Sequence, residues 1–184
     1  MVLSYETLFS AAVAEARRRN LPVFDASPPT NRELDVGGLT LHYLDWGGDA
    51  QLPMLLIHGF MVTAHVWDFF SLEMRGRYHI YAPSLRGHGD SGWASDADYS
   101  RLKMTSDIQR LIEHLNLNNI LLIGHSLGGS IAALVAAQVP ERIRALTLVD
   151  STLLPNPRPN ALAALLNGPD TFASIDAFAA HAAG

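Results

Sequence analysis

The sequence contains no cysteine among its 184 residues. Disulfide bonds, thiolate metal sites and a cysteine nucleophile are therefore excluded within this chain. A chain without cysteine is compatible with a reducing compartment. We expect a cytoplasmic protein that holds no metal ion and no other cofactor.

Long apolar runs and an excess of positive charge are also lacking. The apolar runs stop well short of the roughly 20 residues that a membrane-spanning helix needs. Residues 1–10 include Glu6 and have no basic segment ahead of an apolar one, so we expect no signal peptide. The net charge of −5 argues against nucleic acid as a partner. The sequence predicts no membrane span and does not indicate an oligomeric state.

The composition is that of a globular domain, with 48% hydrophobic and 17% charged residues. Residues 4–19 predict an amphipathic helix whose apolar face carries Leu8, Ala12, Val13 and Ala16. Prolines punctuate residues 21–30, which we interpret as a linker. We therefore treat residues 1–30 as an N-terminal helix and linker.

Residues 31–150 alternate between strand and helix patterns. Two segments with alternating polarity flank Gly37-Gly38 and predict a β-hairpin. Short apolar runs then predict strands, each buried on both faces, at 54–57, 78–82, 120–123 and 145–149. Helical spacing predicts helices at 64–74, 100–116 and 131–139. This alternation predicts an α/β fold with a mostly parallel sheet and helices on both faces.

The pattern changes after Asp150. Prolines cluster near residues 155–159, and Ala-rich segments predict short helices at 161–167 and 171–183. No further strand pattern follows. We interpret residues 151–184 as the start of a helical cap region, and residues 31–150 as the N-terminal part of a core that is incomplete in this chain.

The sharpest chemical signal is Gly124-His125-Ser126-Leu127-Gly128. It fits G-x-S-x-G, it follows a predicted strand directly, and it precedes a predicted helix. The abrupt turn holds the serine in a strained conformation, and the two glycines remove side chains that would collide across it. The free N–H groups of the helix N-terminus favour a developing oxyanion. The motif predicts that Ser126 is a nucleophile exposed at the carboxyl edge of the sheet.

Two further motifs lie upstream. His58-Gly59-Phe60 follows the strand at 54–57, and Arg86-Gly87-His88-Gly89-Asp90-Ser91 follows the strand at 78–82. Together with the serine motif, and in this order, they resemble the α/β-hydrolase superfamily with a serine nucleophile. The resemblance covers residues 31–150 and is specific for the superfamily, but it does not indicate a substrate.

The resemblance implies roles for particular residues. Ser126 would be the nucleophile of the nucleophile elbow, and the backbone N–H groups of Phe60 and Leu127 would form the oxyanion hole. His58 would organise its loop and would not be the catalytic base. The loop at 86–91 would be scaffolding close to the site.

The rest of the catalytic triad is not evident. In this fold the acid and the histidine follow the serine along the chain. His181 is the one histidine after Ser126, and it lies on a predicted helix. Asp150 follows the strand at 145–149 and is either the triad acid or, as we favour, a capping or loop-fixing residue. We expect that the chain is a fragment; the alternative is a truncated homologue that has lost hydrolysis.

The sequence therefore predicts a carboxylesterase-like enzyme that cleaves an ester or related acyl bond of a small molecule through an acyl-enzyme. We expect this chain alone to be inactive. A serine at the elbow argues against relatives such as haloalkane dehalogenases and epoxide hydrolases, which use an aspartate there. It leaves thioesterases, carbon–carbon-bond hydrolases, aminopeptidases and cofactor-free haloperoxidases open. The alternative is a non-catalytic, ligand-binding or degenerate member of the same superfamily.

Overall fold

A computed structural model of the chain describes residues 4–48 and 51–151. The chain divides into two compact units, residues 1–153 and residues 154–184. The described residues all belong to the first unit. The predicted helices at 161–167 and 171–183, and His181, lie outside the described residues, and the predicted domain division stays a prediction.

The first unit is built on a six-stranded sheet with the order β1-β2-β4-β3-β5-β6. Its strands are β1 (Thr30–Asp35), β2 (Thr40–Asp45), β3 (Leu52–Ile57), β4 (Tyr78–Pro83), β5 (Ile120–His125) and β6 (Ile143–Val149). The β1–β2 and β2–β4 pairs are antiparallel, whereas β4–β3, β3–β5 and β5–β6 are parallel. The predicted hairpin and the predicted mostly parallel sheet are both confirmed.

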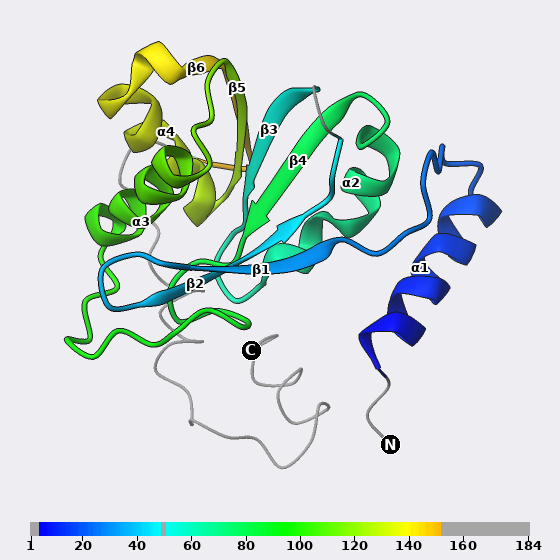
Figure 1. The fold of residues 1–184 in the computed structure, drawn as a ribbon, viewed down its shortest axis with the longest axis horizontal. Helices are drawn as coiled ribbons and strands as arrows, with labels where there is room; N and C mark the ends of the chain where they lie inside the picture. Colours follow the sequence, from blue (N-terminus) through cyan, green and yellow to red (C-terminus); the bar gives the residue numbers. More distant parts are fainter. Residues whose placement is uncertain (1–3, 49–50, 152–184) are drawn as a thin grey trace. The chain divides into compact units, whose positions relative to one another are not determined.

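Helices cover both faces of the sheet, as the sequence predicts. The main helices are α1 (Tyr5–Arg18), α2 (Asp68–Met74), α3 (Arg101–His114) and α4 (Leu127–Gln138). Short 3-10 helices, η1 (Ala64–Trp67) and η2 (Pro140–Arg142), precede α2 and β6. Helices α3 and α4 lie over one face, and α1 and α2 lie over the other (Figure 1). None of the described helices is long and apolar enough to cross a bilayer.

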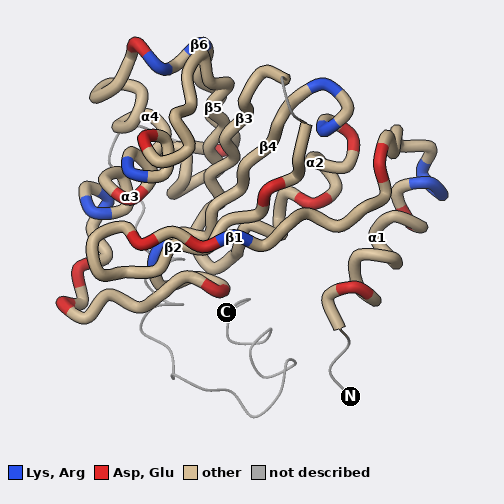
Figure 2. Tube along the Cα trace, viewed as in Figure 1, with Lys and Arg blue, Asp and Glu red and all other residues tan. Residues whose placement is uncertain are grey.

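Alternate residues of each central strand lie on opposite faces of the sheet and belong to two separate core clusters. In β3, Leu55 and Ile57 join the cluster beneath α3 and α4, whereas Met54 and Leu56 join the cluster beneath α1 and α2. This is the two-residue period of a strand that is covered on both sides. Figure 2 shows the consequence for charge, since β3, β4 and β5 contain no Lys, Arg, Asp or Glu.

Three predicted positions of apolar residues are wrong. Leu8 of α1 is 52% exposed, because the buried face of this helix is centred on Phe9 and Val13. Leu102 of α3, which the helical spacing of residues 100–116 places on the apolar side, is 66% exposed, since it lies one position from the helix N-terminus and outside the buried stripe. The predicted double burial of β6 is also wrong, since none of its residues is fully buried at this edge of the described sheet.

Candidate active site at the nucleophile elbow

Ser126 occupies the abrupt junction between β5 and α4. Its backbone angles are φ 51° and ψ −114°, a combination that costs energy for any residue with a side chain. Hydrogen bonds hold it there. The Ser126 N–H donates to the Val149 carbonyl at 2.9 Å, and the Ser126 carbonyl accepts from the Gly129 N–H at 3.0 Å. The surrounding backbone therefore fixes the serine in its strained conformation.

Both motif glycines are required by close approaches of backbone. A Cβ on Gly124 would overlap the carbonyl of Gly128, which is the collision across the turn that the sequence predicts. A Cβ on Gly128 would overlap the carbonyls of Ile57 and His58 instead. The second glycine therefore permits contact between the elbow and the end of β3, a reason that the motif alone does not reveal.

His58 is fully buried and makes hydrogen bonds through both ring nitrogens. Its Nε2 accepts from the Leu85 N–H at 2.9 Å, so its protonated Nδ1 donates to the Gly59 carbonyl at 2.7 Å. Burial, together with the nearby His88 and His125, lowers the pKa of His58 to about 4. The ring is therefore neutral at neutral pH. These contacts tie the loop after β3 to the loop after β4, which fits the predicted structural role.

The turn His58-Gly59-Phe60 lies directly against the elbow. A Cβ built on Gly59 would lie 3.3 Å from Cβ of Ser126. The N–H groups of Phe60 and Leu127 make no hydrogen bond to any other described residue. Leu127 is the first residue of α4, a position whose N–H has no acceptor within the helix. Both N–H groups are therefore available to an oxygen atom beside Ser126.

Phe60 and Leu127 also line a cavity of about 670 Å³. That volume falls in the range of small-molecule sites. Its walls come from the turn after β3, the loop after β4 and the start of α3. The described lining residues are Phe60, Met61, Arg86, Gly87, His88, Trp93, Tyr99, Ser100, Arg101, Met104 and Leu127.

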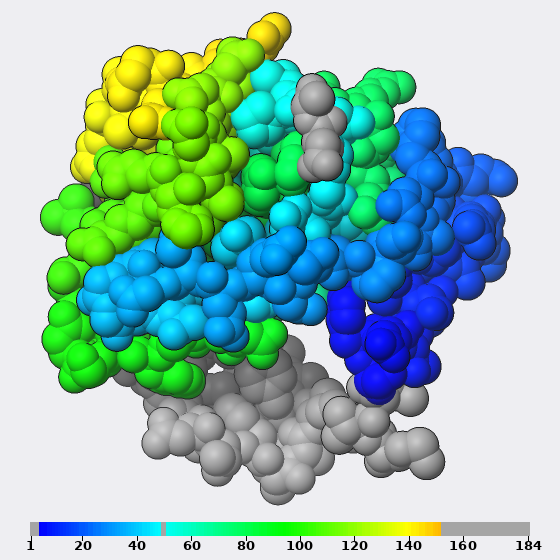
Figure 3. All heavy atoms as spheres, in the orientation of Figure 1, coloured from blue at the N-terminus to red at the C-terminus, as the bar shows by residue number. Residues whose placement is uncertain are grey.

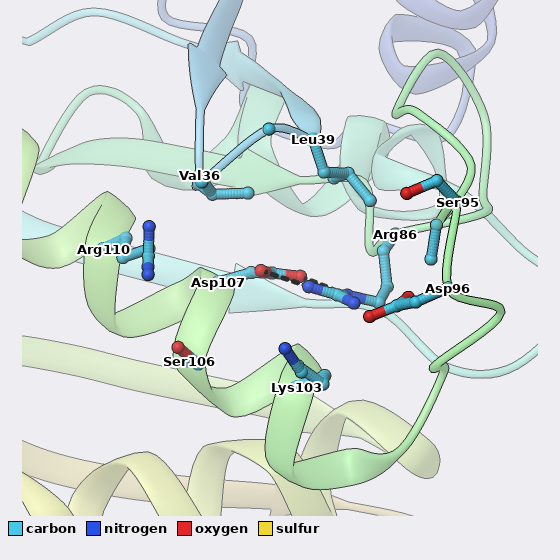
Figure 4. Close-up of a pocket in the computed structure, with 12 residues that line it drawn as sticks. Val36, Leu39, Arg86, Ser95, Asp96, Lys103, Ser106, Asp107 and Arg110 are labelled. Atoms are coloured by element: carbon cyan, nitrogen blue, oxygen red, sulfur yellow. Dashed lines mark hydrogen bonds and ion pairs between the residues drawn. The ribbon is translucent and has the colours of Figure 1, made fainter.

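A buried ion pair holds the loop after β4 against α3. The Arg86 guanidinium donates Nε–H and Nη2–H to the two oxygens of Asp107, at 2.6 and 2.7 Å, and donates Nη1–H to the Asp98 carbonyl at 2.8 Å. Figure 4 shows the two-pronged contact at the wall of a smaller pocket of about 110 Å³, to which Lys103 and Arg110 also contribute. Arg86 therefore lies in the walls of both pockets and fixes their shared loop.

The far part of this loop is fastened to β2. The Ser91 hydroxyl donates to the Ser84 carbonyl at 2.6 Å and accepts from the His42 N–H at 2.9 Å. The Gly92 N–H donates to the Thr40 carbonyl at 2.8 Å. In Figure 3 the hairpin of β1 and β2 lies beside the green segment that follows β4. The loop is thus a scaffold, as the motif predicts, but it also forms the cavity wall, which the motif does not predict.

No described residue makes a hydrogen bond to Oγ of Ser126. Asp150 follows β6 with φ 44°, is exposed, and makes no hydrogen bond to another described residue. The role of Asp150 stays a prediction, but its neighbour does fix the junction, since the Ser151 hydroxyl donates to the Ser126 carbonyl at 2.9 Å. Sequence reasoning missed Ser151 because a serine after a strand carries no distinguishing pattern.

Comparisons with known proteins agree with this geometry. A model of the alpha/beta hydrolase fold family matches residues 53–183. The sn-1-specific diacylglycerol lipase of Mus musculus is 34% identical over 139 residues, which cover 73% of this chain and 45% of the lipase. Epoxide hydrolase 4 of Mus musculus is 33% identical over 114 residues, which cover 61% of this chain and 32% of that enzyme.

Among solved structures, a bacterial membrane phospholipase A superposes with a TM-score of 0.69 at 28% identity, over 88% of this chain and 52% of its own. The chain spans less than half the length of the two curated relatives. The relatives share a hydrolase fold, and their names include both lipases and an epoxide hydrolase. The match to the family model covers well over half of the sequence, and the chain therefore belongs to the alpha/beta hydrolase fold family.

Proposed function

We propose that the whole protein hydrolyses an ester or related acyl bond of a small molecule, with Ser126 as the nucleophile. The observation that carries this proposal is the elbow itself. Ser126 is held in a strained conformation at the N-terminus of α4, beside two N–H groups that no described residue uses. Strain of this kind persists where the surroundings enforce it, and it clusters at active sites.

The proposed reaction has two halves. In the first, Ser126 Oγ loses its proton to a base and bonds to the carbonyl carbon, the N–H groups of Phe60 and Leu127 hold the resulting oxyanion, and the C–O bond breaks as the alcohol leaves with a proton. In the second, water attacks the acyl-enzyme and releases the acid. Each oxyanion donor typically contributes about 3 kcal/mol of transition-state stabilisation.

The base in this proposal is a histidine outside the described residues, since none of those residues is bonded to Ser126 Oγ. A serine without an oriented base is a weak nucleophile. His181 is a poor candidate, because its surroundings predict a helix and no preceding strand. A polypeptide limited to residues 1–184 is therefore expected to hydrolyse p-nitrophenyl acetate no faster than its Ser126→Ala variant.

The lipase and phospholipase relatives support an ester substrate. Epoxide hydrolase 4 is similar to this chain at nearly the same identity, and the serine at position 126 favours ester chemistry over epoxide opening. A serine forms an acyl-enzyme, whereas the epoxide hydrolases that this chain resembles use an aspartate at the elbow. The proposal therefore assigns this chain to the acyl-transferring branch.

The competing proposal is a ligand-binding protein that keeps the fold without hydrolysis, and it is favoured by the lack of any described residue bonded to Ser126 Oγ. A fluorophosphonate probe separates the two on the full-length protein, with Ser126→Ala as the matched control. Labelling that is lost in the variant supports the enzyme. A folded protein that stays unlabelled would overturn the hydrolase proposal and leave the binding protein.

A further inference from the structure

The cavity beside the elbow has a lining that the proposed reaction does not require. Aromatic and thioether side chains of Met61, Trp93 and Tyr99 form much of its wall. Arg86, the most buried cation in the lining, already donates to Asp107 and Asp98. Walls of this kind favour the burial of hydrocarbon and offer few partners to a charged or sugar-like group.

The cavity is placed to receive part of a substrate held at Ser126. Phe60 and Leu127 contribute both the free N–H groups and part of the cavity lining. An oxygen bound by the two N–H groups would therefore hold its carbonyl carbon at the edge of the cavity. One substituent of that carbonyl would extend along the apolar wall.

The wall runs from the core to the surface and is rigidly supported. Met104 of α3 is 4% exposed and belongs to the core cluster beneath α3 and α4, whereas Trp93 is 80% exposed. Between them, the ring of Tyr99 packs on the backbone of Gly87, where an added Cβ would lie 2.7 Å from the ring. The Tyr99 hydroxyl also accepts from the Ala94 N–H at 3.0 Å.

We propose that this cavity binds an aliphatic or aryl chain attached to the reacting carbonyl group, and that Met104 and Trp93 set the preference for long chains. The inference rests on the proposed ester hydrolysis and adds a substrate class to it, namely esters with an extended apolar chain. The chain belongs either to the acyl half or to the alcohol half of the ester, and the two halves can be varied separately.

The test uses the full-length protein and a Met104→Trp variant, in which a larger side chain fills the inner end of the cavity. The acyl arm compares p-nitrophenyl octanoate with p-nitrophenyl acetate, and the alcohol arm compares octyl acetate with ethyl acetate. The ratio of kcat/KM for the long ester to that for the short ester should fall at least about tenfold in one arm. The arm that falls identifies the bound half.

Leu102→Trp is the matched control, because Leu102 lies on the same helix, is 66% exposed and is not in the cavity lining. It should leave both ratios unchanged. Trp93→Ala is the second variant, since an exposed side chain can be removed without unfolding the protein, and it should raise KM for the long ester only. Ratios that stay at the wild-type value in both arms and both variants would overturn the inference.

The failure of this inference can be distinguished from the failure of the proposed function. Hydrolysis that persists in Ser126→Ala would reject the nucleophile and not the cavity. Binding of a long-chain alkyl ketone to Ser126→Ala, measured by calorimetry, needs no catalysis. Binding that weakens about tenfold on adding Met104→Trp would support the cavity in its own right, and binding that is unaffected would count against it.

Discussion

The elbow after β5 and the loop after β4 lie at the same edge of the sheet but are fixed by opposite means. The elbow depends on missing side chains, since Gly124 and Gly128 allow backbone to touch backbone. The loop after β4 depends on side chains that are present, chiefly Arg86 and its partner Asp107. At the elbow no side chain fits at either glycine, whereas the loop is held by contacts between side chains. The elbow carries Ser126, the nucleophile that we propose, and the loop after β4 lines the cavity.

The largest effect is expected in the loop after β4, where the fold depends on a buried pair of charges. Arg86→Met removes the cation and leaves Asp107, which is 2% exposed, as an uncompensated buried carboxylate. Loss of one partner of a buried pair costs about 3–5 kcal/mol. The free energy of unfolding, measured by urea denaturation at pH 7, should fall by that amount.

The double variant Arg86→Met with Asp107→Leu is the control. Replacing both members of a buried pair by apolar residues is often neutral or stabilising. Recovery of most of the lost stability in the double variant would assign the loss to the stranded charge. A double variant as unstable as the single one would instead mean that the pair holds the loop by geometry.

The next effect concerns His58, which ties the loop after β3 to the loop after β4. Its pKa lies at about 4 in the folded protein, below the ordinary value of 6.5. Between these values the unfolded chain binds a proton that the folded chain does not, so stability falls as the pH drops from 6.5 towards 4. His58 should therefore lower the free energy of unfolding by about 3 kcal/mol as the pH falls across this window.

His58→Gln removes the titrating group and keeps a side chain that can accept from the Leu85 N–H. The variant should be less stable than the wild type at pH 7, because the buried contacts are imperfectly replaced. Its stability should also depend less on pH between 6.5 and 4, which urea denaturation across that range would measure. If stability depended on pH in the same way in both proteins, the low pKa of His58 in the folded state would be rejected.

The order of elements in the fold could be predicted from sequence because the apolar residues of each strand and helix recur at a spacing typical of that element. The hairpin, the parallel strands and the helices from α1 to α4 all follow from that spacing. The exact buried faces of α1 and α3 could not be predicted from sequence. Leu8 and Leu102 differ from buried residues only in what lies opposite them in the fold. The exposure of β6 is likewise a property of its neighbours and not of its own residues.

The candidate site also contains some features that could be predicted from the sequence and others that could not. The glycine spacing around Ser126 predicts the elbow, because the steric requirement there can be met only by glycine at fixed positions in the sequence. The cavity wall formed by Trp93, Tyr99 and Met104 could not be predicted in this way. These residues come from a loop and a helix whose sequences contain no motif that indicates a binding site. They are brought together by contacts between distant residues, among them the Arg86–Asp107 pair, which spans 21 positions in the sequence.

A pair of glycine substitutions tests the central contrast directly. Gly124→Ala would force Cβ into the carbonyl of Gly128 and should cost about 2–3 kcal/mol. Gly92→Ala, in the loop after β4, would place Cβ 3.4 Å from the backbone of Thr40, an ordinary contact, and should change stability by less than about 0.5 kcal/mol. Thermal denaturation of both variants gives the comparison, and equal losses would remove the distinction between the two loops.

The smallest effect is expected from Ser151→Ala, which probes how the segment after β6 is joined to the elbow. The variant loses the hydrogen bond from the Ser151 hydroxyl to the Ser126 carbonyl. That carbonyl also accepts from the Gly129 and Ser130 N–H groups, so it keeps partners and no buried acceptor is stranded. A net loss of about 1 kcal/mol in urea denaturation is expected. A loss several times larger would mean that the elbow depends on side chains as well, because the rigidity of its backbone alone would not then hold Ser126 in place.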